Sequence, residues 1–415
     1  MNSRTIKLLC MGALALVVLV TPVLGGCGGG GGGGEETTVV LGWLADQTGV
    51  SSKAFDEVIM GMNDYMTEME ATDPIPGVRI RFEIYDTRLE YARAPLGYEW
   101  LMGQGMSLLL HYDPPEQNAL AAAQAEDEMP SLCFCADVQT LKTDWMYAYS
   151  VDYVSEGKAI VDYLVKDWWE TRGMTRPMKI GALVIGDMQS GGQYWSGLQA
   201  GSAANPGECE LKKQEALRSQ TAWASEVNAL KDCDAIVFTT VGPASATFLK
   251  EVREKGYEGQ LVGVTISALG FWTLISSMVP KSGLDGMLIP HAWYVWTDDA
   301  PFVSNMSAML DKHRPSKAAI LKQGTTWESG WSTAHILAEV VRLAEKNVGA
   351  ENIDNLAMRD ALEQLSLEIE GLPTIGIAGS GGANVLNPYL RMIKYDANAD
   401  EWNATGDWFY ALLST

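Results

Sequence analysis

Two hydrophobic periods alternate along most of the chain. Residues 78–85 alternate apolar and polar side chains, which predicts a strand with one buried face. Residues 53–69 carry apolar side chains at helical spacing, which predicts a helix. The same reasoning predicts further strands at 38–45, 107–112, 131–135, 179–185, 209–216, 235–239, 260–264 and 286–290. It predicts further helices at 92–102, 114–125, 154–170, 193–203, 223–231, 244–255 and 271–277.

The alternation of strand and helix runs through one series and restarts after Asp152. Strands that alternate with helices predict parallel sheets covered on both faces, and two series predict two such lobes. About 380 residues follow position 36, more than one hydrophobic core usually organises. The tail differs, with helices expected at 302–313, 326–346 and 353–365 and a hairpin expected over 389–410. We expect these helices to pack on the first lobe.

The first residues have the pattern of an export signal. Arg4 and Lys7 precede a short apolar run, and small residues lead to Cys27. The segment Leu24-Gly25-Gly26-Cys27 resembles the bacterial lipobox, which implies a signal peptide over 1–26 and a lipidated Cys27. The alternative is an ordinary signal peptide with an incidental cysteine. Residues 27–36 contain an unbroken glycine run and are expected to form a flexible linker between the lipid anchor and the folded domain.

The chain carries a formal net charge of −22, and removal of residues 1–26 would take away two further positive charges. Such an acidic chain is a poor candidate for nucleic-acid binding, which requires Lys and Arg against phosphates. It also argues against a polyanionic ligand. We expect solubility near a membrane surface to account for the charge.

The cysteines of an exported chain are first considered as disulfides. Cys209 and Cys233 lie at the starts of two predicted strands separated by one helix, so a bridge between them is a candidate. Cys133 and Cys135 are two residues apart on one predicted strand and should not bridge each other. A Cys-x-Cys metal site is the alternative to buried apolar cysteine there, but no histidine lies beside them, and we expect no metal.

Ligands of open α/β sheets bind beyond the carboxyl ends of the strands. These ends are rich in Gly, Pro, polar and aromatic residues, as a small-solute pocket would be. They comprise 43–48, 111–114, 135–138, 187–194, 240–243 and 265–268. The rival class is a secreted α/β enzyme, but the sequence contains no nucleophile elbow, phosphate loop or histidine-rich metal spacing. We therefore expect a binding protein without catalysis or cofactor.

The order of elements resembles the type I periplasmic binding proteins, in particular the branched-chain amino-acid receptors of ABC transporters. The resemblance lies in pattern over nearly the whole mature chain. The matching stretches are Leu41 to Gly49, Ile80 to Thr87 with its terminal Asp86, Met129 to Leu132, Val241-Gly242-Pro243, Tyr257 to Gln260 and Gly330 to Glu339.

The resemblance implies an α/β fold of two doubly wound parallel-sheet lobes joined by a three-segment hinge. Lobe one would comprise 37–149 plus 293–365, and lobe two 150–292 plus 366–415. The hinge would lie at 147–152, 291–297 and near 371–376. It further implies a monomer that closes on a small solute in the cleft and delivers it to ABC permease subunits in the membrane. A sensor subunit of the same fold, signalling to a membrane partner, is the alternative.

The resemblance places one contact segment at His111-Tyr112-Asp113, where the family offers Ser side chains and free amides to a ligand carboxylate. Here Pro114 and Pro115 lack the backbone N–H donors of this turn, and Asp113 adds negative charge. Binding of a ligand carboxylate at this turn is therefore expected to be weaker than in the family. Asp113 is either a ligand contact or a helix N-cap.

A second contact segment is Cys135-Ala136-Asp137, in which Asp137 either holds a cationic ligand group or is a solvated loop acid. Thr265 stands where amino-acid receptors of the family carry an acid for the ligand ammonium, which puts an amino-acid ligand in doubt. Tyr194 either places its ring against the ligand or packs between helix and sheet. Gly242 lies in the turn before a lobe-two helix.

Aromatic residues near the hinge and the cleft are further candidates for stacking on a ligand. Trp293 and Trp296 lie in a hinge crossover, where one of the rings either contacts the ligand or packs in a core. Weaker candidates are Trp43, Phe55, Trp195 and Trp327. The acids and aromatic rings together indicate a flat or a cationic apolar solute.

Overall fold

The structure, a computed structural model, describes residues 36–112, 114–134, 136–138, 140–377 and 383–413. Its strands are β1 (Thr37–Ala45), β2 (Val78–Asp86), β3 (Met106–His111), β4 (Ser131–Cys133), β5 (Met146–Ser150), β6 (Met178–Ile185), β7 (Cys209–Ala216), β8 (Ala235–Phe238), β9 (Gln260–Gly263), β10 (Leu288–His291), β11 (Val385–Asn387), β12 (Tyr389–Asp396), β13 (Glu401–Ala404) and β14 (Phe409–Tyr410).

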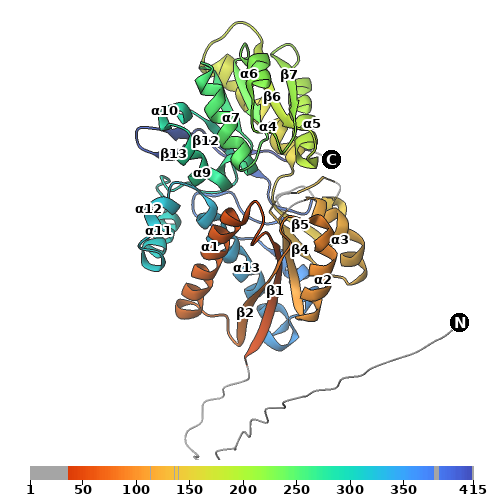
Figure 1. Cartoon of the computed structure of the whole chain (residues 1–415). Helices are drawn as coiled ribbons and strands as arrows, with labels where there is room; N and C mark the ends of the chain where they lie inside the picture. The colour runs from red at the N-terminus through yellow and green to blue at the C-terminus, as the bar shows by residue number, and fades with distance from the viewer. Residues whose placement is uncertain (1–35, 113, 135, 139, 378–382, 414–415) are drawn as a thin grey trace, which may run out of the picture. The chain divides into compact units, whose positions relative to one another are not determined.

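Its α-helices are α1 (Ser52–Thr72), α2 (Ala94–Gly103), α3 (Pro114–Glu126), α4 (Tyr153–Lys166), α5 (Gln189–Ala204), α6 (Ala224–Leu230), α7 (Pro243–Glu254), α8 (Thr265–Ala268), α9 (Trp272–Met278), α10 (Lys281–Leu284), α11 (Pro301–His313), α12 (Ala318–Leu321), α13 (Thr326–Val348) and α14 (Asn355–Gln364). Figure 1 labels most of them. None of the helices in the described ranges has the length and apolarity of a membrane span.

The strands form two sheets, each the centre of one lobe. The first is six-stranded, in the order β11-β5-β4-β3-β1-β2, and its pairs are parallel. The second is eight-stranded, in the order β13-β12-β10-β9-β8-β6-β7, with β14 beside β12. Its strands β10 to β7 are parallel, and β12 runs antiparallel to its neighbours. The predicted α/β fold with two parallel-sheet lobes is confirmed.

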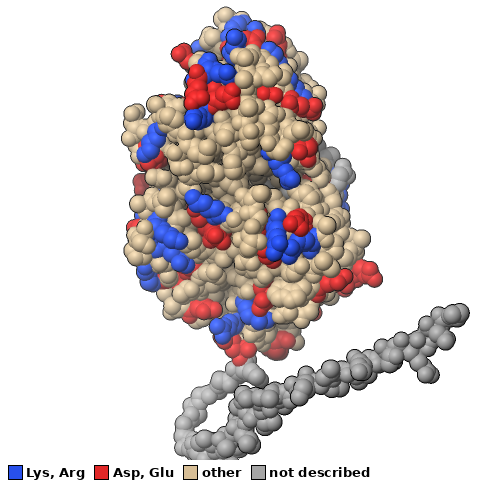
Figure 2. All heavy atoms as spheres, viewed as in Figure 1, with Lys and Arg blue, Asp and Glu red and all other residues tan. Residues whose placement is uncertain are grey.

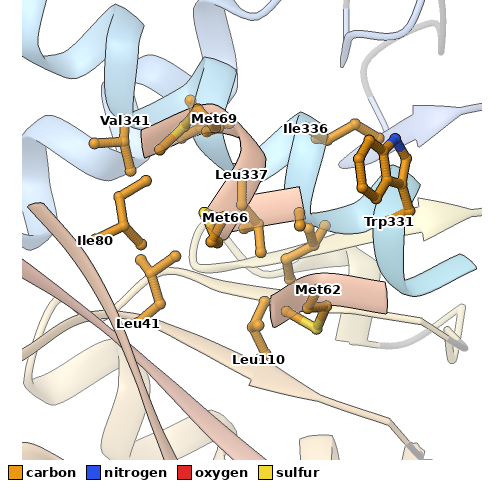
Figure 3. Close-up of a cluster of buried hydrophobic side chains, with 14 of the residues drawn as sticks. Leu41, Met62, Met66, Met69, Ile80, Leu110, Trp331, Ile336, Leu337 and Val341 are labelled. Carbon is orange, nitrogen blue, oxygen red and sulfur yellow. The ribbon is translucent and has the colours of Figure 1, made fainter. Parts of the chain in front are cut away.

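Strand β1 contributes side chains to two hydrophobic cores, one on each face of the sheet. Its side chains point to opposite faces in turn, because a strand has a period of two. Leu41 and Trp43 join the core beneath α1 and α13, whereas Val40 and Leu44 join the core beneath α2. Figure 3 shows Leu41 and Leu110 of the sheet facing Met62 of α1 and Leu337 of α13. Each sheet is thus buried on both faces, which requires nearly continuous apolar strands.

The second lobe repeats this arrangement. Leu183 of β6 belongs to the core covered by α6, α7 and α9, and its neighbours Ala182 and Val184 belong to the core covered by α4 and α5. In Figure 1, α6 and α7 lie on one side of this sheet and α5 on the other. The predicted helices at 302–313, 326–346 and 353–365 return to the first lobe, where α11, α13 and α14 contribute to its main core.

Three crossovers of the described chain join the lobes. One follows β5 and leads to α4, and a second follows β10 and leads to α11. The third joins β11 of the first sheet directly to β12 of the second, at 387–389. The prediction near 371–376 is therefore wrong, and so is the assignment of all of 366–415 to lobe two. Leu372 and Ile375 pack in the lobe-one core, and β11 pairs with β5.

The candidate bridge between Cys209 and Cys233 is also wrong. Both are free thiols in the structure. Cys209 begins β7 and Cys233 precedes β8, but β6 lies between these two strands in the sheet. Two strand spacings amount to about 9.5 Å, beyond the reach of a disulfide. Cys209 pairs with Met178 of β6, whereas the Cys233 Sγ lies beside Gly181 of the same strand, 3.0 Å from the position of a Cβ atom there.

Candidate ligand-binding site

A cavity of about 140 Å³ is lined by residues of both lobes. Lobe one contributes the start of α1, the start of α13 and the residues at the ends of β3, β4 and β5. Lobe two contributes the start of α4, the segment 265–271 and the crossover after β10. Figure 2 shows a hollow in the middle of one face, bordered mainly by uncharged residues. The cavity thus lies at the carboxyl ends of parallel strands, where open α/β sheets bind ligands.

The register of the first sheet explains how lobe one brings its side chains together. His111 of β3 pairs with Cys133 of β4, and Cys133 pairs with Ala148 of β5. The residues that follow these pairs, Tyr112, Phe134 and Tyr149, therefore line up along one edge of the sheet. All three line the cavity.

These rings continue into an aromatic wall, which we define as Trp43, Phe55, Tyr112, Phe134, Tyr149 and Trp293. Ring centroids lie 5.0 Å apart for Phe55 and Tyr112, and 6.1 Å apart for Tyr112 and Phe134. The chain of rings goes on from Phe134 to Tyr149 at 6.4 Å and from Tyr149 to Trp293 at 6.0 Å. Offset and edge-to-face contacts at these distances are favourable and hold the rings in place.

Glu156 lines the cavity from lobe two, one turn into α4. One carboxylate oxygen accepts the backbone N–H of Thr265 at 2.7 Å, and the other accepts the hydroxyl of Tyr194 at 3.0 Å. Burial raises the pKa of Glu156 to about 7, because a charged carboxylate is poorly solvated there, although both hydrogen bonds oppose the shift. The carboxyl is therefore poised between its neutral and charged forms near neutral pH.

His291 and Glu328 lie beside each other where β10 meets α13. The His291 Nε2 donates to the carbonyl oxygen of Tyr294 at 2.9 Å and lies 3.9 Å from the Glu328 carboxylate. Burial lowers the pKa of His291 to about 4 and raises that of Glu328 well above its usual range. His291 is therefore neutral at pH 7. Among the described residues, none hydrogen-bonds to the Glu328 carboxyl oxygens.

Asp137 connects the lobes outside the cavity. Its carboxylate accepts hydrogen bonds from the Nε2 atoms of Gln189, at 2.5 Å, and Gln193, at 2.8 Å. Asp137 follows β4 in lobe one, whereas both glutamines lie in the first two turns of α5 in lobe two. Its side chain is buried by this contact. Neither of the two expectations for Asp137, a ligand contact or a solvated loop acid, matches this position.

The structure gathers Tyr112, Thr265 and Trp293 of the predicted contacts at the cavity. Tyr194 is fully buried behind it and orients Glu156. His111 is fully buried within the sheet and is not among the lining residues, which corrects its predicted contact role. The reason is register, because the last residue of β3 still points into the lobe while the next one reaches the cavity.

Two further predicted contacts lie away from the lining. Ala136 is buried and forms an isolated bridge with Asp152, and Gly242 occupies the N-cap position of α7 with a φ of 60°. The positive φ explains the glycine there. Asp113, Cys135 and the predicted lipidation site Cys27 lie outside the described residues.

Trp43 and Phe55, the weaker aromatic candidates, line the cavity. Four further lining residues were not among the predicted contacts: Phe134, Tyr149, Glu156 and His291. Phe134 and Tyr149 lie at the carboxyl ends of parallel strands, where ligands of open α/β sheets bind, and could have been predicted on that ground. Glu156 carries no distinguishing signal, because acidic residues are common in the first turn of any helix. Its role depends on the approach of α8 and α5, which lie far away in the sequence.

Comparison with known proteins identifies the family. The model of the family described as periplasmic binding protein matches residues 38–398. No curated protein sequence matches the chain significantly.

Solved structures share the fold at low identity. A branched-chain amino-acid ABC transporter protein from Thermus thermophilus with bound valine is 14% identical, with a TM-score of 0.76 over 90% of this chain and 97% of the other. A fatty-acid ABC transporter substrate-binding protein from Thermomonospora curvata is 15% identical, with a TM-score of 0.76 over 90% and 92%. A solute-binding protein from Rhodopseudomonas palustris BisB5 in complex with 3,4-dihydroxybenzoic acid is 16% identical, with a TM-score of 0.72 over 91% and 98%. With its two parallel-sheet lobes and a family match over most of its length, this chain belongs to the periplasmic binding protein family.

Proposed function

We propose that this chain is the extracytoplasmic solute receptor of an ABC importer, anchored to a bacterial membrane through a lipidated Cys27. It captures a small polar or amphipathic solute, such as an amino-acid-like, amide or aromatic compound, and delivers it to the permease without catalysis. The observation that carries the proposal is the cavity at the strand ends of both lobes, lined by aromatic rings and hydroxyl groups. Structural neighbours with bound valine or 3,4-dihydroxybenzoic acid, and one named as a fatty-acid ABC transporter substrate-binding protein, support the class of function but not one ligand.

Capture would proceed by rotation of the lobes about the three crossovers. Side chains from both lobes line the cavity, so a solute held there bridges the lobes and favours the closed arrangement. The hydrogen bonds from Gln189 and Gln193 to Asp137 would stabilise the same arrangement at the rim. The closed form would then dock on the permease.

A thermal-shift screen of amino acids, amides, polyamines, aromatic acids and aryl amines tests the receptor function. A true ligand at 100 times its dissociation constant should stabilise the fold by about 2.7 kcal/mol, which raises the melting temperature visibly. The same compound should lower the radius of gyration in small-angle scattering. Thermal stabilisation without any compaction would contradict capture by lobe closure.

Asp137→Ala provides the mechanistic control in this assay. It removes the acceptor of two hydrogen bonds between the lobes without touching the cavity lining, so binding should weaken about tenfold, equivalent to 1.4 kcal/mol. Asp360→Ala, which removes an exposed acid of α14 in lobe one, should leave the affinity unchanged. Equal affinities of both variants would exclude a role for the Asp137 contact in closure.

Membrane anchoring has a separate test. Because the proposed tether is a lipid on the Cys27 sulfur, a Cys27→Ser variant expressed in a bacterium should move from the membrane fraction to the soluble extracytoplasmic fraction. Immunoblots of the two fractions measure the change, with Cys10→Ser as the matched control that stays on the membrane. A Cys27→Ser protein that remains membrane-bound would rule out the lipid anchor and leave the receptor function untouched.

A further inference from the structure

The charged side chains that line the cavity are of one sign, negative. Among the described residues that line it, none is Lys or Arg. Its ionisable side chains, apart from tyrosines, are Glu156 and His291, and His291 is neutral because burial lowers its pKa to about 4. A ligand carboxylate would therefore meet no positively charged side chain inside the cavity, and only backbone N–H groups and hydroxyls would offset the cost of its desolvation.

The aromatic wall of the same cavity favours positive charge. The six rings of the aromatic wall line the cavity, and the faces of aromatic rings carry partial negative charge. A ligand cation within about 6 Å of such a ring is attracted to it, most strongly when water is excluded. The long-range field of a chain with formal net charge −22 acts in the same direction.

Glu156 is placed to receive a donor from the ligand. An ionised carboxylate offers about four lone-pair sites, and the Thr265 N–H and the Tyr194 hydroxyl each occupy one. The carboxylate is held by these two partners from α8 and α5 while it lines the cavity. The fixed position means that little ordering is needed when an ammonium group approaches.

We propose that the cavity selects an amphipathic organic cation, namely an ammonium group on an aromatic or aliphatic body that carries no carboxylate. This inference rests on the receptor function proposed above and names its ligand class. The ammonium group contacts Glu156, and the apolar body lies against the aromatic wall. Glu156 thereby supplies the acid that Thr265 lacks.

Four probes with one phenylethyl body test the class: 2-phenylethylamine as the cation, 2-phenylethanol as the neutral analogue, 3-phenylpropanoate as the anion and phenylalanine as the zwitterion. Isothermal titration calorimetry of the full-length chain at pH 8 measures their dissociation constants. We expect the amine to bind at least tenfold more tightly than each of the other three.

The variant Glu156→Gln tests the contact. It is nearly isosteric and keeps an oxygen acceptor for the Thr265 N–H, so the fold should persist. The amine should bind 10- to 100-fold more weakly, on the scale of one charged hydrogen bond, whereas 2-phenylethanol should bind within twofold of its original affinity. Glu251→Gln makes the same chemical change in α7 of the same lobe, away from the cavity, and should alter neither affinity.

The pH dependence gives an independent readout. The titratable groups that act on Glu156 are Asp152 at the start of its own helix and Tyr194 from α5, and α8 contributes the uncharged Thr265. Tyr153 and His291 are further titratable residues of the cavity lining. Because the pKa of Glu156 is about 7, the charged fraction rises about tenfold between pH 6 and pH 8. The amine should bind about tenfold more tightly at pH 8 than at pH 6, and this dependence should vanish in Glu156→Gln.

The outcomes separate the ligand class from the receptor function. If the anion, the zwitterion or the alcohol binds as tightly as the amine, the inference is overturned, and compaction of the chain by that probe would still support a solute receptor. If none of the four probes binds, the inference also fails, and the receptor function is then decided by the broader screen and scattering. If Glu156→Gln loses the amine and the alcohol alike, Glu156 has only a structural role and the proposed contact is wrong.

Discussion

Replacing Gly330 with alanine is expected to lower the free energy of unfolding by about 3 kcal/mol. Gly330 lies in α13 where this helix crosses α1, and a Cβ atom at this position would lie 2.0 Å from the carbonyl oxygen of Val58. The contact is reciprocal, because a Cβ on Gly61 of α1 would lie 2.0 Å from the carbonyl oxygen of Trp327. The obstacle on each side is backbone, so relief requires the two helices to move apart.

Urea denaturation monitored by circular dichroism measures this effect as a lower midpoint. Gly192→Ala is the matched control, because Gly192 is an exposed helical residue in α5 with no atom within 4 Å of its Cβ position. This variant should be neutral or more stable by up to about 1 kcal/mol, the difference in helix propensity. A Gly330→Ala chain as stable as the original would mean that α1 and α13 can separate without cost.

The consequence would extend to the cavity, because the starts of both helices line it. Ala54 and Phe55 come from α1, and Thr326 and Ser329 come from α13. Separation of the helices would displace Phe55 from Tyr112, its neighbour in the aromatic wall at 5.0 Å. Gly330→Ala should therefore weaken ligand binding as well as the fold.

His111→Leu is expected to make the protein markedly less sensitive to acid. His111 is fully buried, and neither of its ring nitrogens has a hydrogen-bond partner among the described residues. Burial alone lowers its pKa to about 3 from 6.5. As the pH falls below 6.5, the unfolded chain gains a proton that the folded chain does not accept until about pH 3. Stability contributed by the neutral ring is thus present above pH 6.5 and lost on acidification.

Between pH 7 and pH 4 this loss is on the order of 3 kcal/mol for one histidine. The leucine variant should not show it, so its stability advantage over the original chain should grow by that amount between the two pH values. Urea midpoints at pH 7 and pH 4 measure the difference. Identical pH slopes of the two chains would contradict the assignment of this acid sensitivity to His111.

Glu156→Gln supplies a control of opposite sign for the same measurement. The pKa of Glu156 is raised to about 7 in the folded chain, so its contribution to stability is fully present below its unfolded pKa of about 4.5 and is lost as the pH rises to 7. The glutamine variant should therefore gain stability relative to the original chain on going from pH 4 to pH 7. The two variants together distinguish the contribution of the buried histidine to the pH dependence of stability from that of the buried carboxyl.

The local pattern of apolar and polar residues was sufficient to predict the order of helices and strands along the chain. The helical spacing of Phe55 and Met62 and the strand alternation around Ile80 each depend on neighbours a few residues away, so they can be read without knowledge of the fold. The doubled series of strands and helices predicted two parallel-sheet lobes, and the strand ends predicted the region of the cavity. Tyr112 and Thr265 were found in this way.

The tertiary structure decided what depends on residues far apart in the chain. Strand order places β6 between β7 and β8, which separates Cys209 from Cys233, and pairing with β5 moves β11 into lobe one. The site depends on the same kind of contact. Glu156 becomes a cavity residue because Thr265, more than 100 positions later, brings its N–H to the carboxylate. Hydrophobic periodicity specifies which face of a helix or strand is buried. Which other element covers that face is decided by packing across the whole chain. A pattern of neighbouring residues carries no information about this pairing of elements.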